Sequence, residues 1–111
     1  MSHFPCRGDI YWVALDPTVG SEINKKRPAV IVSNDDGNEL SKRVIIAPIT
    51  SKASKVYPFE VAMTVNNVRG KILLDQIRSV DKIRLGNILG KCERETLAAI
   101  DLALKKVLDL L

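Results

Sequence analysis

A basic run that ends in proline offers the clearest chemistry in this sequence. Lys25, Lys26 and Arg27 are three consecutive cations, and Pro28 follows them at once. Proline fixes its own φ and biases the preceding residue toward an extended backbone, so we expect Arg27 to be held at the start of a strand. A guanidinium has a planar pair of donors that matches two phosphate oxygens. The sequence therefore predicts that Arg27 binds a phosphate.

The basic run ends a polar segment of thirteen residues, 16–28, which lies between two apolar stretches. A loop of this length inside a short chain is usually either functional or disordered. Gly20 is its expected flexible point, whereas Pro28 favours order at its end. We therefore expect an ordered functional loop that presents Arg27 beside a strand.

A second candidate residue follows a proline inside an apolar run. Residues 44–50 are typical of a strand, but Pro48 has no N–H to donate to a ladder, so we expect an edge or a bulge there. Bulges re-aim neighbouring side chains and are frequent beside active sites. The neighbour is Thr50, whose hydroxyl can donate a hydrogen bond.

Short apolar stretches separated by turn residues predict the elements that position these groups. Strands are expected over residues 10–15, 28–34, 44–50, 59–63, 71–74, 77–80 and 88–90. Turns are expected at 35–38, with one helical turn to Leu40 as an alternative, and at 66–70. Tyr11 and Trp12 lie in the first of these strands, and we expect both to pack in the core, with stacking on bases as the alternative. Five to seven short strands without βαβ alternation favour a small, strongly bent antiparallel sheet or barrel.

One helix is expected at the end of the chain. From Glu93 onward, apolar residues recur at intervals of three and four, the helical period. They are Leu97, Ile100, Leu104, Val107 and Leu111. We expect this apolar face to pack against the sheet, which makes the fold mainly β with α, an α+β class.

The net charge of +4 is unevenly distributed. Residues 1–91 hold 14 Lys and Arg against 9 Asp and Glu, whereas residues 92–111 hold 3 against 4. The basic excess therefore belongs to the strand-rich part of the chain, which suits a polyanionic partner.

Length, hydrophobic content, and the cysteines and histidine limit the class of protein to which this chain can belong. A chain of 111 residues with 46% hydrophobic content predicts a single domain, 1–111, and excludes disorder. No apolar run is long enough to span a membrane and no signal-peptide pattern begins the chain, so we expect a cytoplasmic protein. Cys6 and Cys92 have no metal spacing and are expected to be reduced thiols. His3 is the only histidine, so neither a histidine metal site nor a two-histidine mechanism is expected.

Six short motifs, in this order along the chain, resemble those of the MazF/PemK toxins of bacterial toxin–antitoxin systems. They are RGDIY (7–11), LDPTVGSE (15–22), RP (27–28), PITS (48–51), DQIR (75–78) and VDKIRL (80–85). The resemblance covers nearly the whole chain. Each motif is weak alone, but together they are specific.

The resemblance implies a fold and an activity. The fold would be a small SH3-like antiparallel barrel, MazF/CcdB-like, with a C-terminal packing helix, usually as a homodimer. The activity would be that of a ribosome-independent endoribonuclease that cleaves single-stranded RNA, mainly mRNA, at short sequences. Cleavage would need neither metal nor cofactor and would leave 2′,3′-cyclic phosphate and 5′-hydroxyl ends. A cognate MazE-like antitoxin would inhibit it with a flexible acidic segment.

The resemblance also implies roles for particular residues. Arg27 and Thr50 match the catalytic pair, which would stabilise the dianionic transition state of 2′-hydroxyl attack. Arginine is a poor proton shuttle because its pKa lies above about 12, so charge stabilisation is the first role of Arg27. Glu22 and Asp75 are the candidate general bases. Some relatives pair the aspartate with an arginine and a histidine, where this chain has Leu73 and Ser21.

RNA recognition is expected from loop side chains that present polar edges or cations to splayed bases and phosphates. The residues in the matching places are Ser21, Glu22, Lys26, Asn34, Ser51, Lys52 and Gln76.

Two other functions fit the same fold. A CcdB-like toxin poisons DNA gyrase without catalysis, but it depends on a tryptophan-containing C-terminal tail, and residues 107–111 here contain no aromatic side chain. A plain SH3-like RNA-binding module is the second alternative. RNA cleavage in the presence of EDTA would distinguish the nuclease from both.

Overall fold

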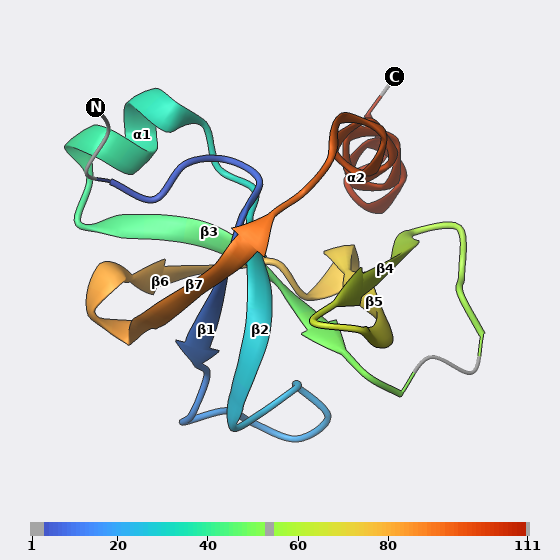
Figure 1. The fold of residues 1–111 in the computed structure, drawn as a ribbon, viewed down its shortest axis with the longest axis horizontal. Coiled ribbons are helices and arrows are strands. Elements are labelled where there is room, and N and C mark those ends of the chain that lie inside the picture. The colour runs from blue at the N-terminus through green and yellow to red at the C-terminus, as the bar shows by residue number, and fades with distance from the viewer. Residues whose placement is uncertain (1–3, 53–54, 111) are drawn as a thin grey trace.

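The computed structural model describes residues 4–52 and 55–110, which form seven strands and two α-helices (Figure 1). His3 and Leu111 lie outside the described residues. The strands are β1 (Asp9–Ala14), β2 (Lys26–Ile31), β3 (Arg43–Thr50), β4 (Glu60–Val65), β5 (Val68–Leu73), β6 (Arg78–Asp81) and β7 (Leu85–Lys91). The helices are α1 (Asp35–Leu40) and α2 (Arg94–Val107), and short 3-10 turns cover Leu74–Gln76 and Lys82–Arg84. No described helix has the length and apolar character needed to cross a membrane.

All strand pairs are antiparallel, in the order β4-β5-β3-β2-β1-β7, with β6 also paired to β3. The sheet is strongly bent, as the sequence predicts, and carries α2 after its last strand. Figure 1 shows the β1–β2 loop, residues 15–25, at the opposite end of the molecule from α1 and α2.

The sheet buries both of its faces. Alternate residues of β2 belong to different cores, with Val30 in one and Ile31 in the other. The first core contains Ile10, Val30, Val32, Ala47, Ile49, Val61, Ile72, Leu74, Ile100 and Ala103, and the second contains Val13, Leu15, Ala29, Ile31, Val44, Ile46 and Val80. Because α2 contributes Ile100 and Ala103 to the first core, the predicted packing helix is confirmed.

Pro48 lies inside β3 without breaking the strand, and the pairing of β3 with its neighbours explains why. One side of β3 pairs with β2, where Pro48 lies opposite Ala29. The other side pairs with β6 through Ile46 and with β5 from Ile49 onward. Pro48 therefore lies where this side of β3 passes from one partner strand to the next, which meets the requirement for an edge position.

Two local expectations were wrong. The turn predicted over 66–70 is confined to Asn66 and Asn67, both with positive φ (49° and 65°), and β5 already begins at Val68. Consecutive left-handed residues make a tight two-residue hairpin, which asparagine tolerates well. Trp12 is 40% exposed and does not lie in the core. The β1–β7 register shifts on both sides of Tyr11, and the Cβ of Trp12 lies close to Gly86 of β7.

Candidate active site

Arg27 lies where β2 leaves the β1–β2 loop, opposite Val13 of β1. Its Nε donates a hydrogen bond to the carbonyl oxygen of Asn24 at 3.0 Å. Among the residues that the structure describes, neither Nη atom makes a hydrogen bond or an ion pair. The loop thus orients the guanidinium and leaves its Nη donors available to a ligand.

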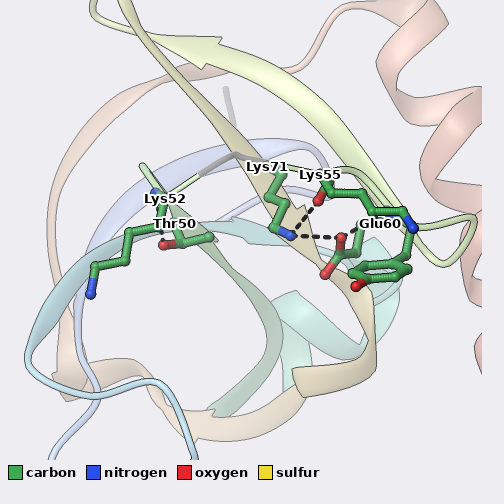
Figure 2. Close-up of polar contacts among 6 residues, drawn as sticks. Thr50, Lys52, Lys55, Glu60 and Lys71 are labelled. Carbon is green, nitrogen blue, oxygen red and sulfur yellow. Dashed lines mark hydrogen bonds and ion pairs between the residues drawn. The ribbon is translucent and has the colours of Figure 1, made fainter.

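Thr50 ends β3, and its side chain is almost fully buried, with 8% of the residue exposed. Its Oγ1 accepts a hydrogen bond from the backbone N–H of Lys52 at 3.2 Å, as Figure 2 shows. Because this bond uses an oxygen lone pair, the hydroxyl hydrogen remains available to donate.

Gly70 allows β5 to pass close to Thr50. A Cβ atom at Gly70 would lie 2.4 Å from the carbonyl oxygen of Thr50, closer than non-bonded atoms approach. Only glycine therefore fits at this position without movement of the backbone.

Arg27 and Thr50 line the same pocket, which has a volume of about 270 Å³. Lys26 and Ser51, two of the residues expected to bind RNA, also line it. The complete lining is Trp12, Lys26, Arg27, Pro28, Ile49, Thr50, Ser51, Val65, Asn66, Val68, Arg69, Gly70 and Leu89. Among these described residues three are cations and none is a carboxylate, so the pocket suits an anion.

Sequence reasoning did not assign a binding role to three polar or aromatic residues of this pocket. Asn66 and Arg69 come from the β4–β5 hairpin, which looks like an ordinary turn in the sequence. Trp12 was expected in the core, with stacking on bases as the alternative, but it is 40% exposed and lines the pocket. The useful signal was the pair of Arg69 and Gly70, a cation beside a residue that permits close approach of strands.

A second pocket, of about 310 Å³, brings together four other predicted residues: Ser21, Glu22, Asp75 and Gln76. The side chains of Glu22 and Gln76 hold the β1–β2 loop. Glu22 Oε1 accepts from the backbone N–H of Val19 at 2.6 Å, and Gln76 Oε1 accepts from that of Ile23 at 2.8 Å. Glu22 and Asp75, the two candidate bases, line this second pocket and not the pocket of Arg27 and Thr50.

Two predicted RNA-binding residues line neither pocket. The Asn34 side chain caps α1 and accepts a hydrogen bond from the backbone N–H of Gly37 at 2.7 Å. Lys52 is exposed, and its backbone supports Thr50. No group of three or more potential His, Cys, Asp or Glu metal ligands comes together in the described part of the chain.

Comparison with known proteins places this chain in a family. Residues 6–108 match the model of the PemK-like, MazF-like toxin of type II toxin–antitoxin systems. Endoribonuclease MazF9 of Mycobacterium tuberculosis is 42% identical, over 94% of this chain and 96% of its own. Endoribonuclease EndoA of Bacillus subtilis is 36% identical, over 95% of each chain.

Solved structures share the fold over nearly the whole chain. MazF of Deinococcus radiodurans superimposes with a TM-score of 0.86 at 30% identity, covering 98% of this chain and all of its own. A mycobacterial endoribonuclease solved in complex with its cognate antitoxin gives a TM-score of 0.81 at 29% identity, covering 96% and 97%. The sheet described above is thus a MazF-like fold. The chain belongs to the PemK-like, MazF-like family of toxins of type II toxin–antitoxin systems.

Proposed function

We propose that this protein is a toxin that cleaves single-stranded RNA, mainly mRNA, independently of the ribosome and without a metal. The observation that supports this most is the shared pocket of Arg27 and Thr50, whose lining adds two further cations, Lys26 and Arg69, and no carboxylate. The relatives named as endoribonucleases cover the chain almost end to end, which supports the same activity. The cytoplasm, where mRNA is translated, is the proposed location.

In the proposed reaction the 2′-oxygen of a ribose attacks its own 3′-phosphate, and the bond from phosphorus to the 5′-oxygen breaks. The 2′-hydroxyl proton goes to a base and the 5′-oxygen gains a proton, which gives a 2′,3′-cyclic phosphate and a 5′-hydroxyl. The Nη donors of Arg27 bind the non-bridging phosphate oxygens, where negative charge develops. The Thr50 hydroxyl donates to the same phosphate, oriented by the Lys52 N–H.

The general base is proposed to be Glu22 or Asp75. Both lie in the second pocket, and Glu22 belongs to the loop that leads to Arg27. Glu22→Gln and Asp75→Asn are made as separate variants, and kcat is measured against pH for each. The variant that loses the acidic limb of this profile identifies the base. If neither substitution changes that limb, neither residue is the base.

RNA is proposed to reach beyond the cleaved phosphate. Ser51 and Lys26 contact it at the first pocket, Ser21, Glu22 and Gln76 read bases at the second, and Lys52 and Asn34 make outer contacts. We also propose a homodimer and a MazE-like antitoxin. The cationic lining of the first pocket suits an acidic antitoxin segment, and a mycobacterial relative has been solved with its cognate antitoxin.

The test is cleavage of single-stranded RNA by the purified protein in excess EDTA. Removal of one transition-state donor typically lowers kcat by about 10²–10³-fold, so Arg27→Ala and Thr50→Ala should each lose at least about 100-fold. Arg94→Ala and Thr96→Ala, on α2 and outside both pockets, are the matched controls and should cleave normally. Undiminished cleavage by both site variants, or cleavage that EDTA abolishes, would refute the proposal.

A further inference from the structure

Lys71 is a buried lysine that the proposed reaction does not use. It lies in β5 directly opposite Thr50 of β3, and only 9% of the residue is exposed. Its Nζ donates hydrogen bonds to the carbonyl oxygen of Lys55 at 2.7 Å and to Glu60 Oε1 at 2.9 Å (Figure 2). Lysine is rarely buried unless it is paired, so this arrangement calls for a reason.

Of the two partners of Lys71, Lys55 lies in the far arm of the β3–β4 loop, whose described residues are 51–52 and 55–59, and Glu60 is the first residue of β4. Glu60 Oε1 also accepts from the backbone N–H of Tyr57 at 2.9 Å, and the Glu60 N–H donates to the Tyr57 carbonyl at 2.9 Å. The Tyr57 ring stacks on Phe59 and lies 5.5 Å from Lys71 Nζ. The ammonium group of Lys71 therefore binds the far arm at two places, directly at Lys55 and through Glu60 at Tyr57.

The near arm of the same loop begins at the candidate catalytic hydroxyl. Lys52 is tied to Thr50 Oγ1 through its backbone, and Ser51 lies between them. Figure 2 shows Lys71 between this pair and the group of Lys55 and Glu60. Lys71 thus joins the two arms, because its backbone pairs with Thr50 and its side chain binds the far arm.

Stability alone is a poor reason for this ion pair. The Lys71 and Glu60 side chains are only 11% and 7% exposed, and burying two charges usually costs as much free energy as their attraction returns. Apolar replacements of such pairs are often neutral or stabilising, whereas removal of one partner is strongly destabilising.

We propose that Lys71 is a positioning residue that holds the described arms of the β3–β4 loop, residues 51–52 and 55–59, in place for RNA binding by Ser51 and Lys52. This inference rests on the proposed nuclease function. Arg27 and Thr50 are held by strand pairing, so loss of Lys71 affects substrate binding more than the chemical step.

The decisive variant is Lys71→Met combined with Glu60→Gln, because Lys71→Met alone would leave the Glu60 carboxylate buried without a cation. We expect the double variant to keep its Tm, to raise KM for single-stranded RNA about 10-fold, and to change kcat less than about 3-fold. Amide hydrogen exchange of residues 55–60, measured without RNA, should accelerate in the same variant. Lys71→Arg keeps the donors and should retain a KM near that of the wild type. Lys105→Met combined with Glu95→Gln, both exposed on α2, loses the same two charges and is the charge-matched control.

The outcomes separate the two proposals. A wild-type protein that cleaves no RNA refutes the nuclease function, and the exchange measurement still tests the role of Lys71 in holding the loop. If the wild type cleaves and the folded double variant shows unchanged KM, Lys71 does not position the loop for RNA. Unchanged exchange of residues 55–60, or a fall in kcat with KM unaltered, would likewise overturn the inference.

Discussion

A Gly70→Ala substitution in β5 is expected to displace Thr50 of β3 and so to lower both stability and RNA cleavage. The new Cβ would lie 2.4 Å from the Thr50 carbonyl oxygen, whereas ordinary contact begins near 3.4 Å, so β3 and β5 must separate by about 1 Å. Alanine in a strand normally stabilises by about 0.5–1 kcal/mol relative to glycine, but overpacking against backbone costs about 1–3 kcal/mol. We expect a net loss of about 1–2 kcal/mol, which lowers Tm by about 4–8 °C for a domain near this size.

The same displacement should lower the rate of RNA cleavage, because Thr50 is moved relative to Arg27. A misplacement of about 1 Å can cost about 10²-fold in rate, and we expect a loss of that order in kcat. Thermal unfolding and single-turnover cleavage would be measured on the same preparation. Gly37→Ala in α1, where the nearest neighbour is the Asn34 side chain at 3.3 Å, is the control for stability. A Gly70→Ala protein with wild-type Tm and wild-type cleavage would refute the argument from close approach.

Three further predictions follow from the described contacts. RNA affinity should fall steeply with salt. A plot of log affinity against log salt concentration should have a slope of about −2 if the three pocket cations each neutralise one phosphate. A flat response in binding titrations would contradict an anion site. Asn38→Ala should cost about 1–3 kcal/mol in urea unfolding, because the buried Asn38 amide bonds both the hydroxyl and the carbonyl of Ser33, whereas the exposed Asn87→Ala should be neutral. Burial raises the pKa of the Cys92 thiol to about 11, although the Arg7 cation opposes the shift. Since the unfolded thiol loses its proton at lower pH, stability should fall between about pH 9 and 11, and the Tm advantage of wild type over Cys92→Ala should shrink across that range.

The sequence alone contained most of the fold. Short β-branched runs, turn residues between them and a terminal 3.6-residue period predicted the strands and α2, because each signal is local. The motifs around Arg27 and Thr50 pointed to the family for the same reason, since they occupy consecutive positions. The ends of the strands were predicted less well. Composition predicted a turn over 66–70, but the turn holds only Asn66 and Asn67, and β5 begins at Val68.

The distribution of the predicted site residues between pockets was decided only by the tertiary structure. Pairing of β3 with β5 and the bend of the sheet put Arg27 and Thr50 in one pocket and Glu22 and Asp75 in another, although nothing local distinguishes these pairs. The exposure of Trp12 depends on the β1–β7 register.

The role of Lys71 also depends on long-range contacts. In the sequence it is one lysine among many, whereas in the fold it lies opposite Thr50 and binds the loop that follows. Side-chain burial and cross-strand partners depend on pairings between distant residues, which local patterns of polarity do not encode.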